Sequence, residues 1–225
     1  MKKLLPLIVT LITLTGCNQA TTQTPPPPPP ESILSQTTPK PPNSPPNPPT
    51  LQNNPITPKS IGAAKLGMTL KELKTYLGSM AKFQTKSPYI VDFDAIEVSQ
   101  GGKIQYYILY PAGQPLKDND TITLLLTENP GYKTEKNISA GTLIKEAEKV
   151  YGKPKLSYNI DNEGREIVNF ANQPKNLMFL LGNANNGTLA GVYPKVGGDY
   201  HETNKYNSQA TIRAIMVTCR QQECK

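Results

Sequence analysis

A twelve-residue segment occurs twice in this 225-residue chain, and it limits the possible folds more than any other feature. Residues 67–78, GMTLKELKTYLG, align without a gap with residues 141–152, GTLIKEAEKVYG, at an offset of 74 residues. Both copies begin and end with glycine and carry a Lys-Glu pair directly after an apolar residue. Self-similarity of this kind indicates two copies of one structural unit.

Each copy predicts a short amphipathic helix, because its apolar residues recur at helical spacing. The predicted buried stripes are Leu70, Leu73 and Leu77 in the first copy and Leu143, Ala147, Val150 and Tyr151 in the second. Thr69 and Glu72 have the spacing of a capping box at the start of the first helix. Gly78 and Gly152 are expected to end the two helices.

Strand-like runs follow each predicted helix. They cover residues 90–98, 104–110 and 121–127 in the first unit and 155–160, 166–171, 177–181 and 211–218 in the second. Gly101-Gly102 separates two of them and predicts a hairpin turn. The sequence therefore predicts an α+β fold of two tandem units, about 60–130 and 131–225, each a helix followed by an antiparallel meander. The helices are expected to pack on one sheet face and to leave the other face free or solvated.

The first residues predict export and a lipid anchor. Lys2 and Lys3 precede an apolar run over residues 4–14, which is too short to cross a bilayer because crossing needs about 20 apolar residues. The run ends in Leu14-Thr15-Gly16-Cys17, which resembles the lipobox of a bacterial lipoprotein signal. The resemblance implies that residues 1–16 are removed and that acylated Cys17 becomes the first residue. A cysteine beside an ordinary secretory cleavage site is the alternative.

The lipobox also implies localisation to the bacterial cell envelope, where the acylated Cys17 would insert into the lipid bilayer, the expected partner. In the Gram-negative lipoproteins that this motif resembles, an aspartate after the cysteine favours the inner membrane. This chain has Asn18 there, so in a Gram-negative host the outer membrane, facing the periplasm, is expected.

Residues 17–59 are expected to be the lipidated cysteine followed by a disordered, proline-rich linker. They hold 15 of the 23 prolines, including the block PPPPPP at 25–30, and have almost nothing to bury. A spacer that holds the folded domain of residues 60–225 away from the membrane is favoured. A docking site for a proline-recognising module is the alternative.

Two further cysteines, Cys219 and Cys224, lie near the C-terminus. Because an exported protein meets an oxidising compartment, these two are expected to form a small disulfide. A metal pair or a redox dithiol is disfavoured, because the spacing is not Cys-x-x-Cys and the chain has a single histidine.

The segment from residue 183 to 207 is rich in Asn, Gly and Tyr and is predicted to be a long loop. Loops of this length are often functional, and this composition is typical of adaptable binding surfaces. Tyr193, Tyr200 and Tyr206 are therefore candidate partner contacts. A mobile insertion without a partner is the alternative.

No catalytic residue, cofactor or metal site is predicted. The chain lacks the common nucleophile, zinc, phosphate-loop and dinucleotide motifs, and His201 lies in a polar, loop-like stretch. Asp92 and Asp94 could share a strand face but are read as ordinary surface residues, and the segment from Asp118 lacks the glycine and glutamate of a calcium loop. The net charge of +7 is dispersed, so nucleic acid is not expected as a partner.

The pattern Gly-Met-Thr followed by Leu-x-x-Leu and a closing glycine, in an exported chain with strands after it, resembles the SmpA/OmlA family of small outer-membrane lipoproteins (BamE). In tandem, the pattern is similar to β-lactamase inhibitor protein, which implies two helix-plus-sheet repeats with a continuous concave surface. The expected function is an envelope lipoprotein with a non-enzymatic binding or scaffold module for a protein or cell-wall partner. A small envelope hydrolase with an unrecognised site and an inhibitor of an envelope enzyme are the alternatives.

Overall fold

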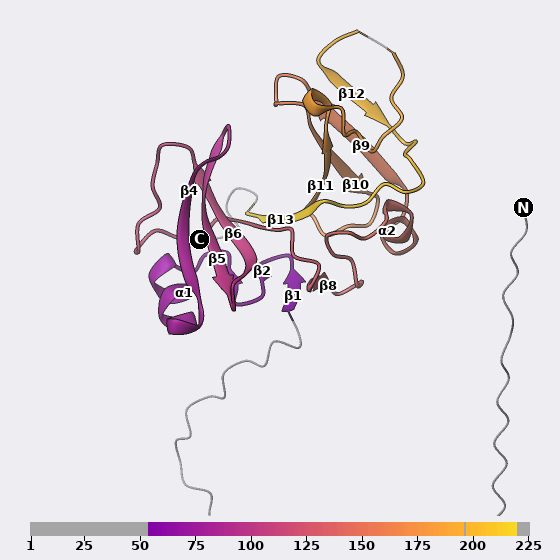
Figure 1. Cartoon of the computed structure of the whole chain (residues 1–225). Helices are drawn as coiled ribbons and strands as arrows, with labels where there is room; N and C mark the ends of the chain where they lie inside the picture. The colour runs from indigo at the N-terminus through magenta and orange to yellow at the C-terminus, as the bar shows by residue number, and fades with distance from the viewer. Residues whose placement is uncertain (1–53, 196, 220–225) are drawn as a thin grey trace, which may run out of the picture. The chain divides into compact units, whose positions relative to one another are not determined.

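The computed structural model describes residues 54–195 and 197–219 (Figure 1). The chain divides into two units, residues 1–46 and 47–225, and all described residues belong to the second. The signal peptide, the lipobox with Cys17 and nearly all of the predicted linker lie outside the described residues. The first strand begins at residue 54, inside the range predicted as linker.

The first repeat is a helix followed by a four-stranded meander. It consists of α1 (Leu70–Leu77), the 3-10 turn η1 (Gly78–Met80), β4 (Lys82–Ile90), β5 (Phe93–Gln100), β6 (Lys103–Pro111) and β7 (Leu124–Thr127). The predicted capping box is confirmed, since Thr69 Oγ1 accepts from the Glu72 amide and the Glu72 carboxylate accepts from the Thr69 amide. The predicted hairpin at Gly101-Gly102 is also confirmed.

The second repeat has the same order with one inserted strand. It consists of α2 (Ile144–Tyr151), β9 (Pro154–Asn159), β10 (Arg165–Phe170), β11 (Leu177–Asn183), the 3-10 turn η2 (Ala184–Asn186), β12 (Tyr200–Thr203) and β13 (Ala214–Thr218). The helices start at residues 70 and 144, which preserves the offset of 74 residues. Val150, predicted in the buried stripe of α2, is instead exposed.

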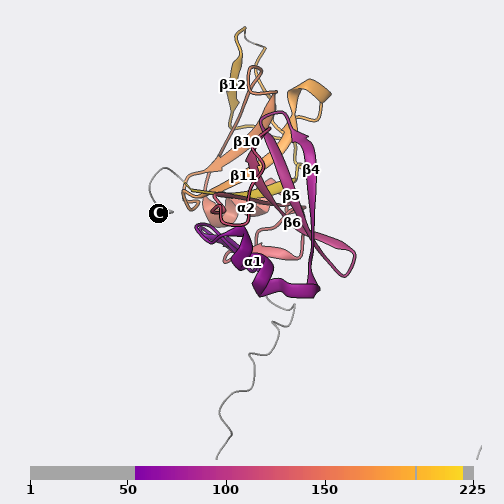
Figure 2. The same ribbon diagram turned by 90° about the vertical axis from the view of Figure 1, so that its left-hand side faces the viewer.

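The strands form two sheets. A four-stranded sheet has the order β3 (Ala64–Lys65), β2 (Ser60–Ile61), β1 (Asn54–Thr57), β8 (Tyr132–Thr134), and β1 runs parallel to β8. A nine-stranded antiparallel sheet has the order β12-β9-β10-β11-β13-β7-β6-β5-β4. Strands β4, β5 and β6 lie side by side at one end of it (Figure 2).

Equivalent backbone hydrogen bonds support the duplication. The Gly67 amide donates to the Ile122 carbonyl at 2.8 Å, and the Gly141 amide donates to the Ile212 carbonyl at 2.7 Å. Isolated antiparallel bridges Thr69↔Thr121 and Leu143↔Thr211 lie beside these bonds. Each helix is thus fixed to the chain just before the last strand of its own repeat.

The main core lies on one face of the nine-stranded sheet. Leu73 and Ala147, at the equivalent position of the two helices, are both fully buried there. Ile56, Ile61 and Tyr132 of the four-stranded sheet belong to the same cluster. This face is therefore covered by strands and loops as well as by the two helix stripes.

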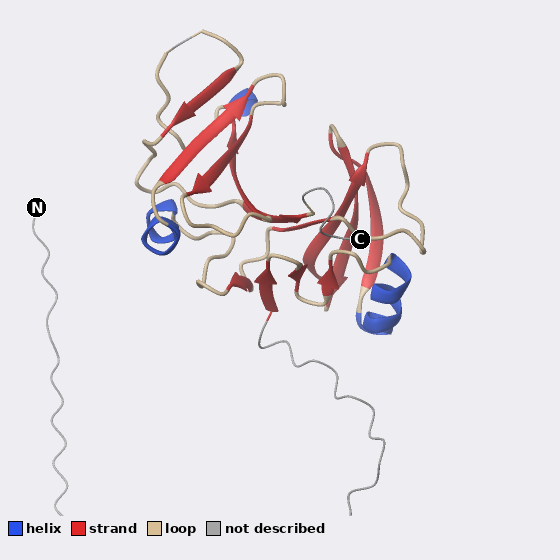
Figure 3. Cartoon of the chain, turned by 180° about the vertical axis from the view of Figure 1, so that it is seen from behind, coloured by secondary structure: helices blue, strands red, loops and turns tan. Residues whose placement is uncertain are grey.

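The predicted α+β class is wrong. The fold is mostly β: of the described residues, 45% are in strands and 13% are helical, and the two α-helices among them have eight residues each (Figure 3). Both helices end at glycine residues after about two turns, so they supply only part of the core on their sheet face. Strands β4 and β12 add to the nine-stranded sheet from segments with no clear apolar alternation, which the pattern did not indicate.

Among the described residues, no helix combines the length and apolar character needed to cross a membrane.

Candidate functional site

The second face of the nine-stranded sheet carries apolar side chains where a solvated face was expected. Because side chains alternate along a strand, Leu125, Ile215 and Val217 point to the main core and their neighbours point to the other face. A second buried cluster forms on that other face, made of Ala95, Tyr107, Leu109, Leu126, Leu180, Ala214 and Met216. The two faces are therefore both apolar near the middle of the sheet.

A cleft of about 770 Å³ opens over this second cluster. Its apolar lining comes from both repeats and comprises Tyr89, Ile90, Phe93, Leu124, Leu126, Ile167, Met178, Leu180 and Met216. This volume lies in the usual range of ligand-binding clefts. An apolar cleft on a sheet face is the arrangement expected for recognition, since such a face in an antiparallel sheet is commonly polar when it meets only water.

The floor of the cleft crosses the junction of the two repeats. Met178, Met216, Leu126 and Tyr107 are successive cross-strand partners on β11, β13, β7 and β6. The register pairs Met216 with Leu126, Ile215 with Thr127 and Val217 with Leu125. Since Leu126 and Met216 hold equivalent places in the two repeats, a local two-fold axis passes through their pair. Met178 and Met216 give this floor flexible, polarisable side chains that adapt to different shapes.

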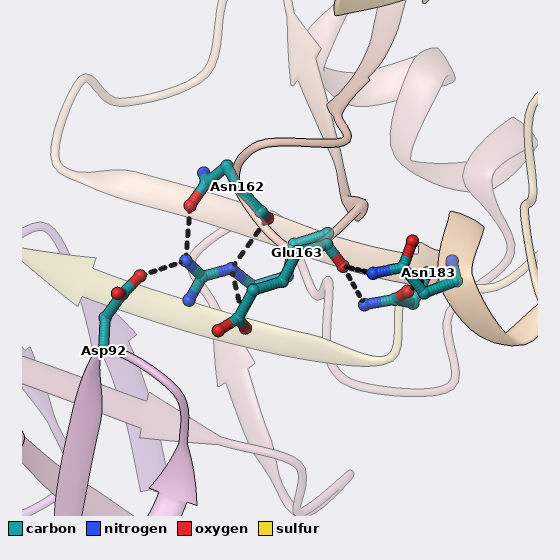
Figure 4. A network of polar contacts seen from close by, with 6 residues as sticks. Asp92, Asn162, Glu163 and Asn183 are labelled. Atoms are coloured by element: carbon teal, nitrogen blue, oxygen red, sulfur yellow. Dashed lines mark hydrogen bonds and ion pairs between the residues drawn. The ribbon is translucent and has the colours of Figure 1, made fainter. Parts of the chain in front are cut away.

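A polar network at the rim joins the two repeats (Figure 4). The Arg165 guanidinium, on β10, donates through Nη2 to the Asp92 carboxylate in the β4–β5 turn and to the side-chain oxygen of Asn162. The Arg165 side chain is 19% exposed and that of Asp92 is 55% exposed, so solvent reaches this ion pair from the Asp92 side. It connects hairpin turns that are 73 residues apart in the sequence.

Glu163 stands beside this network in an unusual backbone conformation. Its φ is +57°, in the left-handed region that few non-glycine residues adopt. Its carbonyl oxygen accepts hydrogen bonds from the side-chain amides of Asn183 and Asn185, each at 2.9 Å. These two bonds hold the turn between β9 and β10 against the start of η2.

Aromatic rings support the first-repeat end of the cleft. Tyr89 packs on Tyr107 with ring centroids 4.7 Å apart. Burial raises the pKa of both phenols above their ordinary value, and the nearby Glu128 carboxylate adds to the rise. Both side chains therefore stay neutral at physiological pH and can donate hydrogen bonds.

The three tyrosines predicted as partner contacts lie in different surroundings. Tyr193 is half-buried, donates to the Glu166 carboxylate at 2.8 Å and packs edge-on against Tyr158. Burial, and then the hydrogen bond to Glu166, raise its pKa. Tyr206 donates to Glu148 of α2, and burial together with this bond raises its pKa to about 12. Tyr200 lines the cleft and is 55% exposed. All three tyrosines thus have internal partners, since the Tyr200 hydroxyl donates to Glu202 at 3.2 Å, but only Tyr200 lines the cleft, where a ligand could touch it.

The remaining candidates do not come together. His201 is buried on β12 and stacks on Tyr158, and Asp94 is buried and accepts from the Gly113 amide, whereas Asp92 is at the rim. Cys219 is disulfide-bonded, but Cys224 lies outside the described residues, so their pairing stays a prediction. Within the described part of the chain, no group of three or more His, Cys, Asp or Glu residues is placed to hold a metal ion.

Sequence reasoning missed the cleft residues, although a signal was present. The run Leu124-Leu125-Leu126 puts apolar side chains on both faces of one strand, and Ile215-Met216-Val217 does the same in the equivalent strand. A strand that is apolar on both faces is typical of a sheet covered on both sides. These two runs could therefore have indicated that the second face is apolar rather than solvated.

Comparisons with known proteins leave the family open. No family model matches the chain, and no curated protein matches it. Among solved structures, the chain is similar to the crystal structure of the uncharacterized protein yfeY from Escherichia coli. The TM-score is 0.44 at 10% sequence identity, with 74% of this chain and 99% of that chain covered. The resemblance to the SmpA/OmlA family stays a prediction.

Proposed function

We propose that this protein is a membrane-anchored envelope lipoprotein whose folded domain is a non-enzymatic binding module. In this proposal, the cleft on the second face of the nine-stranded sheet binds apolar groups of a partner. The lipobox ending in Cys17 supports the anchor, and the proline-rich residues after it support a spacer between membrane and domain.

The observation that carries the proposal is the apolar floor of the cleft. Leu126 and Met216 are nearly buried, yet Ile167, Met178, Leu124 and Phe93 beside them remain partly open to solvent. Keeping such side chains in water costs about 25 cal/mol for each Å² of apolar area. A partner that covers them recovers this free energy, which is the usual source of affinity at a recognition site.

The rim gives the cleft a defined shape. The Arg165–Asp92 ion pair links the two repeats at one side, and the Arg213–Glu128 ion pair lies next to the last strand. Polar rims around an apolar centre are typical of specific interfaces. The arrangement therefore favours selective binding over unspecific adhesion.

The test measures binding of an environment-sensitive apolar dye to the folded full-length protein. Replacing Ile167 or Met178 by Glu places a charge on the cleft floor at positions that are only partly buried, so we expect about a tenfold loss of dye affinity. Val150→Glu is the matched control, because Val150 is an exposed apolar residue on α2.

Thermal unfolding of each variant checks that the fold is retained. Dye binding that is equal in all three variants, or absent from the wild-type protein, would show that the cleft is not a binding site.

A further inference from the structure

Glu163 differs from the other charged side chains that line the cleft. Asp92 and Arg165 bond to each other, and Arg213 bonds to Glu128. Within the described residues, the Glu163 carboxylate accepts no hydrogen bond: Oε1 is buried without a partner, and Oε2 lies 3.8 Å from Arg165 Nε. A carboxylate in a partly apolar setting is strongly stabilised by hydrogen-bond donors, so this one has unused capacity to accept them.

The position of this carboxylate is fixed by the backbone. The left-handed conformation of Glu163 and the two side-chain amides on its carbonyl oxygen hold the residue at the wall of the cleft. The side chain is 25% exposed, and the terminal torsion of a glutamate is soft. Either oxygen can therefore turn toward a group in the cleft without moving the main chain.

The charges around Glu163 do not balance. Asp92 and Glu163 bring two negative charges against the single positive charge of Arg165, and Arg213 is neutralised by Glu128. One negative charge is left over at this side of the cleft. A ligand with a cationic group is complementary to it.

The wall on this side is rich in neutral hydrogen-bonding groups. Ser157, Asn159, Asn162, Asn183, Asn186 and Thr188 line the cleft above the apolar floor. The side-chain oxygens of Asn159, Asn162 and Asn186 already accept hydrogen bonds within the domain. Their side-chain N–H groups make no hydrogen bond within the described residues, so they suit the C=O groups of a peptide, which a lipid tail does not offer. The floor itself suits apolar side chains that point to one side of an extended chain.

We propose that the occupant of the cleft is an extended segment of a partner protein, with apolar side chains on the floor and a lysine or arginine against Glu163. This inference rests on the proposed function, because it names the ligand of the same cleft. The cation of the partner completes the hydrogen bonding of the Glu163 carboxylate and balances the extra negative charge.

The experiment uses full-length protein in phosphatidylcholine nanodiscs and two labelled peptides of alternating valine and threonine. One peptide has a single central lysine, and the other has norleucine in its place. Fluorescence anisotropy should show that the wild-type protein binds the lysine peptide about tenfold more tightly, as expected for one charged hydrogen-bonded pair. Glu163→Gln should abolish this preference and leave the affinity for the norleucine peptide unchanged.

Glu146→Gln is the control for net charge, because Glu146 is paired with Lys149 on α2 and does not line the cleft. This variant should keep the preference for lysine. Equal binding of both peptides to the wild-type protein, or an unchanged preference in Glu163→Gln, would overturn the inference. If neither peptide binds but a fluorescent fatty acid does, the occupant is an acyl chain, and the peptide inference is wrong while the apolar cleft remains a binding site. The dye measurements at Ile167 and Met178 separate this result from a failure of the proposed function.

Discussion

A single buried carboxylate, Glu166, orders the segment between β11 and β12. It is 1% exposed and accepts four hydrogen bonds, from the amides of Gly182, Ala190 and Gly191 and from the Tyr193 hydroxyl. Gly191 fits there because it has no side chain: a Cβ atom would lie 3.0 Å from Glu166 Oε1 and 2.6 Å from the Tyr193 ring. The composition of this segment indicated a binding loop, but the carboxylate that anchors it lies outside the segment, on β10. Local composition could not show which of its tyrosines are used internally.

Replacing Glu166 by alanine should lower the free energy of unfolding by ~3 kcal/mol, because the buried amide of Ala190, the part-buried amides of Gly182 and Gly191 and the Tyr193 hydroxyl lose their acceptor. Glu166→Gln keeps one acceptor oxygen and should have a smaller effect. Urea unfolding gives the free energies, and amide hydrogen exchange at Ala190 and Gly191 reports the loop itself. Glu202→Ala, which removes an exposed carboxylate on β12, is the control and should leave exchange at these two amides unchanged. Unchanged exchange in Glu166→Ala would show that the loop is held by other contacts.

At the scale of elements, local signals predicted the helices and missed the edge strands. Glycine residues, a capping box and apolar spacing all act within a few residues, so α1 and α2 follow from the sequence. Strand β4 is an edge strand with exposed residues on both sides, and its Lys82 and Lys86 do not alternate with buried positions. Strand β12 forms because it pairs with β9, and the paired residues are 41 to 47 positions apart in the sequence. Such pairing depends on tertiary contacts that one strand's own pattern does not contain.

Substitutions in α1 measure how much one short helix contributes to the stability of the fold. Leu73 is fully buried, so Leu73→Ala should cost ~2–5 kcal/mol through lost burial and the cavity that remains. Lys71→Ala is the control, because Lys71 is exposed and should change the stability by no more than ~0.5 kcal/mol. Lys74 would be a poorer control, since it pairs with Asp118 at 2.7 Å. Equal unfolding midpoints for the Leu73 and Lys71 variants would contradict the packing of α1 on the core.

At the scale of the whole folded unit, the two repeats share one sheet. Strands β7 and β13 pair where the repeats meet, so the first repeat supplies four strands of the nine-stranded sheet and the second supplies five, and both repeats line the cleft. The duplication could be read from the sequence because the helix segments are alike. That the two copies share one sheet could not be read from the sequence, because it depends on how the last strand of one copy pairs with the last strand of the other. The cleft is a product of this pairing, which is why no motif marks it.

The shared sheet predicts that the repeats do not fold separately. Residues 54–137 and 138–219, each produced alone, would leave β7 or β13 as an open edge and uncover Leu125, Ile215 and Val217, which are fully buried in the whole molecule. Burial of one such side chain contributes ~1.5–3 kcal/mol, so losing part of three of them removes much of the ~5–15 kcal/mol that stabilises a typical domain. We expect each half to show no cooperative unfolding transition by circular dichroism, and an equimolar mixture to recover one. The control is the full chain cleaved at a protease site inserted at Lys136, in the turn after β8, which should keep its fold because the cut leaves the β7–β13 pair intact. A cooperative transition in either half alone would show that the repeat is an independent folding unit, and that the central strand pair is an interface between two domains rather than the middle of one sheet.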